Sequence, residues 1–303
     1  METTSAVEEL NRRFGTPGVA KICGGNGGLP RIQITGSRAE GEMYIHGAQV
    51  TSWKPDGNDE VLFLSTKSHW QEGQAIRGGI PICFPWFRAK ADDPKAPAHG
   101  LVRTKSWQLE SIVEDKSGVC VSMSTQSDEQ TRRWWPAEFR LEYRVVFGPE
   151  LSLELVCTNT GKIALRFEEA LHTYHRVADV ANVRLEGLDA VHFLDNNDSN
   201  AAKVQYGELK IISATDNAFV GTEHDVDLID PGLRRHIRLK KANSLTTVVW
   251  NPWREGAARL GDLGDGEWTQ FLCVEASNIL GASVSLAPRE EHKITAVLSA
   301  AKL

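Results

Sequence analysis

The chain has 303 residues, of which 41% are hydrophobic, so it can bury a large core as two average domains or as one large all-β domain. Its net charge of -6 disfavours general nucleic-acid binding, which depends on neutralising phosphates with a basic surface. No stretch approaches about 20 consecutive apolar residues, so we expect no association with a membrane through a spanning helix.

The cysteines do not form a recognisable framework. They are odd in number and widely spaced, without the paired spacing of a zinc site or the density of a disulfide scaffold: Cys23, Cys83, Cys120, Cys157 and Cys273. This pattern is typical of buried thiols in a reducing compartment. The segment 1–15 lacks the charged and apolar regions of a signal peptide, so we expect a cytoplasmic protein.

One helix is predicted near the N-terminus, at about residues 5–15. Ser5 and Glu8 have the spacing of a capping box, and Gly15 can end the helix. Apolar residues share one of its faces: Val7, Leu10 and Phe14. The following GGNGG run at 24–28 lacks the GK[ST] ending and the helix of a phosphate-binding loop, so it predicts a flexible turn.

From there on, short alternating runs replace the helical pattern. They have the period of half-buried strands and occur at 31–35, 119–124, 140–147, 151–156, 245–250 and 292–300. Clusters of turn-forming residues separate them, at 24–30, 54–60, 147–150, 158–162, 194–200 and 260–267. This pattern predicts an all-β fold of antiparallel strands. We find no repeat or linker, so a single domain over 1–303 is the simplest interpretation.

The stretch EEALHTYHRVADV at 168–180 contains two histidines in a strand-prone run. Residues three apart share a face on a helix but point to opposite faces of a strand. In an all-β chain, His172 and His175 therefore face opposite sides and cannot share one metal ion. An imidazole with a pKa near its reference value of about 6.5 can exchange protons at neutral pH, although two structural histidines would give the same pattern.

Two arginines form a second candidate cluster. Arg77 begins the run RGGIPICFPWF at 77–87, and Arg103 ends HGLVR at 99–103. Gly78-Gly79 would let a ligand approach the main chain closely. The two guanidinium groups would then bind phosphate or sugar hydroxyls, unless Arg77 is only a surface cation over a tight turn.

The third candidate is Glu275, which ends the apolar strand residues of FLCVEASN at 271–278. A carboxylate on an apolar surface tends to have a raised pKa, which suits a general base near neutral pH. Tryptophans such as Trp86, Trp250 and Trp253 offer flat faces for sugar rings, although most tryptophans belong to cores.

Taken together, these segments resemble the D-hexose-6-phosphate mutarotases, or glucose-6-phosphate 1-epimerases, of the galactose mutarotase-like superfamily. Seven motifs match in order over roughly 25–298: GNGGLP, GAQVTSW, RGGIPICFPWF, HGLVR, ALHTY, VVWNPW and CVEASN. The resemblance implies a large antiparallel β-sandwich that holds a sugar phosphate in a cleft. Opening and closing a sugar ring by acid–base chemistry needs no metal or other cofactor. Nothing in the sequence suggests an obligate partner, so we expect a monomer.

The resemblance also implies roles for individual residues. His172 would be the general acid that protonates the ring oxygen, and Glu275 the base that takes the proton of the anomeric hydroxyl. The implied substrate-binding residues are Arg77, His99, Arg103 and Asp227. Two positions depart from the family pattern: Ala98 replaces a residue that is often glutamine, and Leu228 replaces a basic residue after Asp227.

Three other interpretations stay open at this level. The chain could act on unphosphorylated aldoses, which the loss of a polar residue at Ala98 would favour. It could bind a sugar phosphate without turning it over. It could also hold a metal ion of cupin type, with ligands drawn from His69, His99, His172 and His175.

Overall fold

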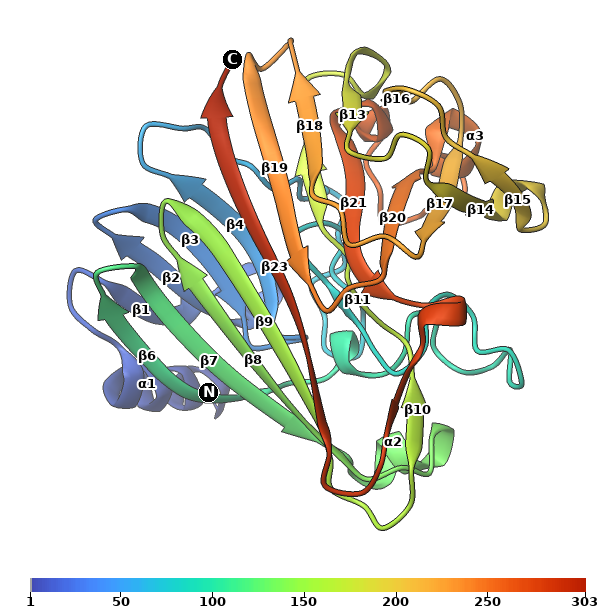
Figure 1. Ribbon diagram of the computed structural model, residues 1–303. Helices are drawn as coiled ribbons and strands as arrows, with labels where there is room; N and C mark the ends of the chain where they lie inside the picture. The colour runs from blue at the N-terminus through green and yellow to red at the C-terminus, as the bar shows by residue number, and fades with distance from the viewer. Residues whose placement is uncertain (1) are drawn as a thin grey trace.

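The computed structural model describes residues 2–303, and its named strands pair in antiparallel fashion throughout (Figure 1). The largest sheet has nine strands in the order β16-β13-β18-β19-β23-β9-β8-β7-β6. Their bounds are β6 Gln108–Asp115, β7 Gly118–Gln126, β8 Phe139–Phe147, β9 Glu150–Asn159, β13 Arg184–Glu186, β16 Leu209–Lys210, β18 Val226–Asp230, β19 Arg235–Ala242 and β23 Glu291–Lys302.

A second sheet of eight strands has the order β15-β14-β17-β20-β21-β11-β5, and β12 also pairs with β21. Their bounds are β5 Ile82–Cys83, β11 Glu169–Leu171, β12 Tyr174–Arg176, β14 His192–Asp195, β15 Ala201–Val204, β17 Thr215–Val220, β20 Thr246–Asn251 and β21 Phe271–Asn278. In Figure 1 its strands β20, β17, β14 and β15 lie to the right of β19 and β23, and β21 lies between β20 and β11 in the sheet order.

The remaining strands form two smaller sheets. One has four strands: β1 Ala20–Gly24, β2 Pro30–Gly36, β3 Ala39–Tyr44 and β4 Gln49–Pro55. The other pairs β10 Leu165–Phe167 with β22 Val284–Leu286. The helices are short: α1 Glu2–Phe14, α2 Glu129–Trp134 and α3 Trp253–Ala257, with 3-10 turns η1 Asn26–Gly28, η2 Val102–Thr104, η3 Val180–Asn182, η4 Asn196–Asp198, η5 Glu267–Gln270 and η6 Leu280–Ala282.

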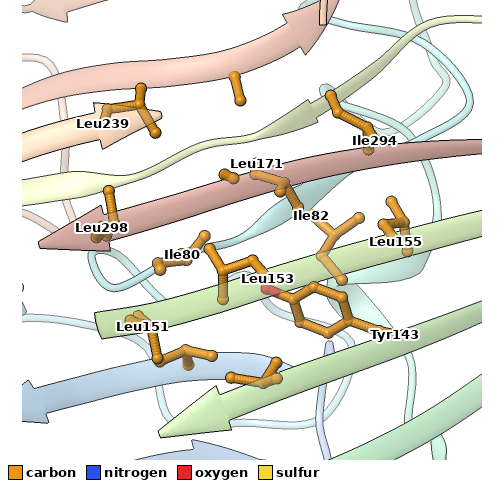
Figure 2. Packing of buried hydrophobic residues seen from close by; sticks show 14 of the residues in the cluster. Ile80, Ile82, Tyr143, Leu151, Leu153, Leu155, Leu171, Leu239, Ile294 and Leu298 are labelled. Carbon is orange, nitrogen blue, oxygen red and sulfur yellow. The ribbon is translucent and has the colours of Figure 1, made fainter. Parts of the chain in front are cut away.

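The alternation of β9 shows why this sequence forms a sandwich. Leu151, Leu153 and Leu155 are fully buried, whereas the residues between them are partly exposed. Figure 2 shows these leucines meeting Ile80 and Ile82, so side chains from both large sheets share one core. Burying each leucine contributes roughly 1.5–3 kcal/mol, which favours this register over a shift by one residue.

The N-terminal helix forms as predicted on its apolar face but begins earlier than expected. α1 begins at Glu2, so Ser5 lies within the helix and is not its N-cap. Its C-terminal end agrees with the prediction, because the Gly15 N–H donates to the carbonyl of Asn11 at 2.8 Å. Val7, Leu10 and Phe14 pack against the main core.

The antiparallel sandwich with an N-terminal helix confirms the predicted fold class. Within residues 2–303, none of the helices combines the length and the apolar character that a membrane crossing requires.

Candidate active site

His172 and Glu275 are direct neighbours across two antiparallel strands. β11 and β12 pair with β21 in one continuous register, which places His172, between them, opposite Glu275. His172 Nδ1 lies 3.2 Å from Glu275 Oε1, and the residues are only 5% and 0% exposed. The backbone bends here, because the Thr173 N–H donates to the Leu171 carbonyl at 2.9 Å and the His172 N–H donates to Pro81 at 3.0 Å.

This pair is unusual because its buried polar atoms have no hydrogen-bond partners. His172 Nδ1 and both carboxyl oxygens of Glu275 are unpaired with respect to the described residues. Burial lowers the pKa of His172 well below its usual range, and the charges of Arg103 and Arg77 lower it further. Burial raises the pKa of Glu275 well above its usual range, and Asp216 adds to this. These directions favour a neutral pair in which Glu275 carries the proton.

Aromatic side chains hold the His172 ring in place, and His175 lies on the other face of the strand. The ring of Tyr174 stacks on that of His172, with centroids 4.8 Å apart and planes 9° apart, and Trp250 meets the imidazole edge-on at 5.9 Å. His175 instead places its Nε2 3.4 Å from the carbonyl of Val274 and does not line the pocket that His172 lines. Burial lowers the pKa of His175 to about 4.

Arg77 lies beside this pair, but its guanidinium is already occupied. Nε and Nη2 lie 3.2 Å and 3.0 Å from Asp262 Oδ2, and Nη1 donates to the Tyr174 hydroxyl at 2.9 Å. Burial lowers the pKa of Arg77, but Tyr174 and Asp262 raise it by more, so the net shift is upward. Arg77 is therefore a fixed part of the wall, joined to the His172 ring through Tyr174.

The glycines after Arg77 do not leave main chain open to a ligand, contrary to the interpretation from sequence. Gly78 and Gly79 have positive φ angles of 115° and 61°. A Cβ atom on Gly78 would lie 2.4 Å from the carbonyl oxygen of Phe63, and one on Gly79 would lie 2.1 Å from that of Val50. Both glycines are required because the chain packs tightly against neighbouring backbone.

His99 comes from the loop that follows β5 and Arg103 from the next turn, η2, and they differ from Arg77 in having no carboxylate partner. The Arg88 N–H donates to His99 Nδ1 at 3.3 Å, so this nitrogen is an acceptor and Nε2 is the donor. Arg103 donates from Nη2 to the Ala98 carbonyl at 2.9 Å, and its buried Nε has no partner. Among the described residues, none forms an ion pair with Arg103.

Arg88 and Asp216 form a second ion pair in the site. Arg88 Nη2 lies 2.5 Å from Asp216 Oδ1, and Asn196 donates to Oδ2 at 2.7 Å. Asp216 lies on β17, across β20 from Glu275. Neither residue is in a motif that pointed to the site, although Asp216 is a lone acid in the strand-like run TDNAFV at 215–220.

These side chains surround one pocket with a volume of about 230 Å³. Its lining combines the acid and base candidates with three arginines and an aromatic wall: Arg77, Phe87, Arg88, Ala98, His99, Arg103, His172, Asp216, Val248, Trp250, Leu260 and Glu275. Of the three tryptophans considered from sequence, Trp250 lines this pocket, whereas Trp86 and Trp253 pack in clusters elsewhere. The arrangement can bind a small polar molecule and exchange protons with it.

Comparison with known proteins agrees with this geometry. The profile of a family described as Aldose 1-epimerase matches residues 30–299. The chain belongs to the aldose 1-epimerase family. A relative from Salmonella typhimurium named "Putative glucose-6-phosphate 1-epimerase" is 35% identical over 248 residues, covering 82% of each chain. A relative of the same name from Cenchrus ciliaris is 32% identical over 284 residues, covering 90% of this chain and 85% of the other.

Solved structures show the same fold for this aldose 1-epimerase family member. A crystal structure described as a "putative mutarotase (YeaD)" from Salmonella typhimurium has a TM-score of 0.89 at 31% identity, covering 95% of each chain. A galactose mutarotase-like protein from Lactobacillus casei has a TM-score of 0.72 at 16% identity, covering 89% of this chain and all of the other. The predicted mutarotase-like sandwich is thus confirmed.

Five of the six site residues expected from the sequence of this family member meet in the pocket, and Asp227 does not. Asp227 lies on β18 in the nine-stranded sheet. Its carboxylate accepts from Arg238 Nε at 2.7 Å and contacts His236 Nε2 at 2.6 Å. Arg238 holds the pKa of Asp227 below its usual range. The acid that lines the pocket is Asp216 instead.

The structure also separates the four histidines that the cupin-type interpretation needed. His69 is exposed and His175 faces away from the pocket, so only His99 and His172 approach each other, with ring centroids 5.6 Å apart. A different group of possible metal ligands does come together: His172, Cys273 and Glu275.

Proposed function

We propose that this aldose 1-epimerase family member interconverts the α and β anomers of a hexose 6-phosphate, with glucose 6-phosphate as the expected substrate. The observation that carries the proposal is the buried His172–Glu275 pair facing a pocket whose Arg103 has no carboxylate partner. The names of the Salmonella typhimurium and Cenchrus ciliaris relatives support the choice of substrate.

In the proposed reaction, Glu275 takes the proton of the O1 hydroxyl while His172 gives a proton to the ring oxygen O5. The C1–O5 bond breaks as the C1 carbonyl forms. Rotation about C1–C2 then presents the other face of the carbonyl, and the ring closes with the two proton transfers reversed. These steps use general acid–base chemistry of the kind that contributes about 10²–10⁴-fold each.

The pKa directions of the pair are compatible with these roles because the two groups act as a unit. A neutral pair and an ion pair contain the same number of protons, so a shift of the proton from Glu275 towards His172 makes both groups active. Burial lowers the pKa of His172, and Arg103 and Arg77 add to this effect. A phosphate beside Arg103 would offset that positive charge and thereby favour the protonated acid.

Charge balance supports one position for the phosphate in the proposed site. Asp262 offsets the charge of Arg77, and Asp216 offsets that of Arg88. The charge of Arg103 has no such partner among the described residues, so a dianionic group is stabilised most at this side chain. We therefore assign Arg103 to the phosphate, and Arg77 together with His99 to the sugar hydroxyls.

An anomer-exchange measurement by NMR tests this function. Purified protein would be added to equilibrated glucose 6-phosphate and, separately, to glucose, and the rates of exchange between the α and β signals would be compared. We expect kcat/KM to be at least about tenfold higher for the phosphate, since one charge-assisted contact contributes roughly 1.5–3 kcal/mol. Equal values would indicate a general aldose 1-epimerase, and no exchange with either sugar would indicate a binding protein.

A further inference from the structure

We propose that His172, Cys273 and Glu275 form an inhibitory site for a thiophilic divalent cation such as Zn²⁺. One donor atom from each of these residues lies within 4.8 Å of the others, and all three residues are buried. The site is distinct from a cofactor site, because ion binding would occupy the acid and the base of the proposed reaction. That inhibition rests on the proposed function, whereas binding of the ion does not.

The sheet itself brings the three donors together. Cys273 and Glu275 are two residues apart on β21, so their side chains lie on the same face of the sheet. His172 is opposite Glu275, and Tyr174 is opposite Cys273. A backbone hydrogen bond of 3.2 Å from Val274 to Thr173 ties the two segments at this point.

An independent observation shows that two of the three residues have donor atoms without partners. His172 Nδ1 and both Glu275 carboxyl oxygens are buried and have no partner among the described residues. Another buried carboxylate, Glu267, instead accepts hydrogen bonds from Ser65, Thr66 and Gly264. Unpaired buried polar groups cost folding free energy, so a cation that binds all three donors would remove a cost that the fold otherwise retains.

The chemistry of the donors selects the class of ion. A thiolate, an imidazole and a carboxylate together are typical of Zn²⁺, whereas Ca²⁺ and Mg²⁺ prefer oxygen ligands alone. Metal–ligand bonds of about 2.0–2.3 Å require ligand atoms roughly 3.3–3.7 Å apart in a tetrahedron. The spacing of up to 4.8 Å therefore has to shorten by about 1 Å, which small side-chain rotations can supply. On binding, the Cys273 thiol proton and the proton that Glu275 carries both leave to solvent.

The position of the site explains why binding would inhibit. His172 and Glu275 line the pocket that is proposed to hold the sugar, whereas Cys273 lies behind them in a cluster with Phe63 and Phe271. An ion therefore enters through the same pocket as the substrate. Ion and sugar exclude each other, so the inhibition should be competitive.

The test uses full-length protein freed of metal with EDTA and then titrated with ZnCl₂ during anomer exchange. We expect competitive inhibition that sets in at micromolar zinc. Cys273→Ala should keep exchange within about twofold, because the thiol takes no part in the proton transfers, and should need at least about tenfold more zinc for the same inhibition. The matched control is Cys120→Ser, which removes a buried thiol on β7 and should leave the zinc response unchanged.

A second measurement needs no activity and so separates this inference from the proposed function. Co²⁺ added to the metal-free protein should give a near-ultraviolet sulfur-to-cobalt band in the wild type and in Cys120→Ser, but not in Cys273→Ala. The band together with an inactive protein would uphold the site and overturn the function. Absence of the band, or zinc inhibition that Cys273→Ala does not change, would overturn the site.

Discussion

Nδ1 of His172 lies 3.2 Å from Oε1 of Glu275, and neither atom has a hydrogen-bond partner among the described residues. The carboxyl and the imidazole are thus held in contact by the register of the strands and by the aromatic rings around His172, and not by a hydrogen bond to each other. Groups held in this way are free to exchange protons with a substrate, so their activity depends on the strand pairing that aligns them.

His172→Ala and Glu275→Ala should each lower the rate of anomer exchange by at least about 10²-fold, because each removes one of the two proton-transfer groups. His175→Ala should have a much smaller effect, since His175 faces away from the pocket. Exchange NMR on the three variants, with near-ultraviolet circular dichroism to verify folding, provides the measurement. Equal losses of exchange rate in His172→Ala and His175→Ala would contradict the assignment of His172 as the acid.

The features that could be predicted from the sequence are those that short-range patterns determine. The alternation of Leu151, Leu153 and Leu155 indicated the sandwich, and the ordered motifs led to His172 and Glu275. In both cases the informative residues lie close together in the chain, either in one strand or in one motif. Such signals do not depend on knowing which strands pair.

The parts that the sequence did not predict depend on long-range pairing. Asp216 reaches the pocket because β17 pairs with β20, and Asp262 meets Arg77 although 185 residues separate them. Asp227 was expected in the pocket from the order of motifs, but it lies in the other large sheet. The tight packing of Gly78 against the Phe63 backbone likewise could not be predicted, because it depends on how the two segments pair.

Glu275→Gln should raise the free energy of unfolding although it abolishes the proposed base. Burial raises the pKa of Glu275 well above its usual range, so at neutral pH this carboxyl has to take up a proton on folding, whereas an amide needs none. We expect a gain of about 1 kcal/mol, or roughly 2 °C in Tm, by urea and thermal denaturation. Glu267→Gln is the matched control and should lower the free energy of unfolding, since that carboxylate accepts several hydrogen bonds. A loss of stability in Glu275→Gln would contradict the prediction.

His175 should make the protein less stable in acid. Burial lowers the pKa of His175 in the folded state to about 4, from about 6.5 in the unfolded chain. Between these two values the unfolded chain binds a proton that the folded protein does not, so the free energy of unfolding decreases as pH falls from 6.5 towards 4. The loss should reach roughly 2 kcal/mol by pH 5. Urea denaturation at pH 7 and pH 5 should show this loss in the wild type and a smaller one in His175→Phe. The same loss in both proteins would show that other groups cause it.

Arg103→Met should weaken binding of glucose 6-phosphate specifically. Arg103 has no carboxylate partner among the described residues, so a phosphate that binds there gains a full charge-assisted contact worth roughly 1.5–3 kcal/mol. Its loss should raise KM for glucose 6-phosphate by about tenfold or more and leave turnover of glucose nearly unchanged.

Arg77→Met provides the contrast, because Arg77 already binds Asp262 and donates to the Tyr174 hydroxyl. Removing it leaves the Asp262 carboxylate unpaired and releases the ring that stacks on His172. We therefore expect Arg77→Met to reduce kcat/KM by similar factors for glucose and glucose 6-phosphate, unlike Arg103→Met. Steady-state kinetics of both variants on both substrates give the four kcat/KM values that this comparison requires. If Arg103→Met lowered the two activities equally, Arg103 would serve the sugar ring or the fold, and the assignment of the phosphate to this side chain would be wrong.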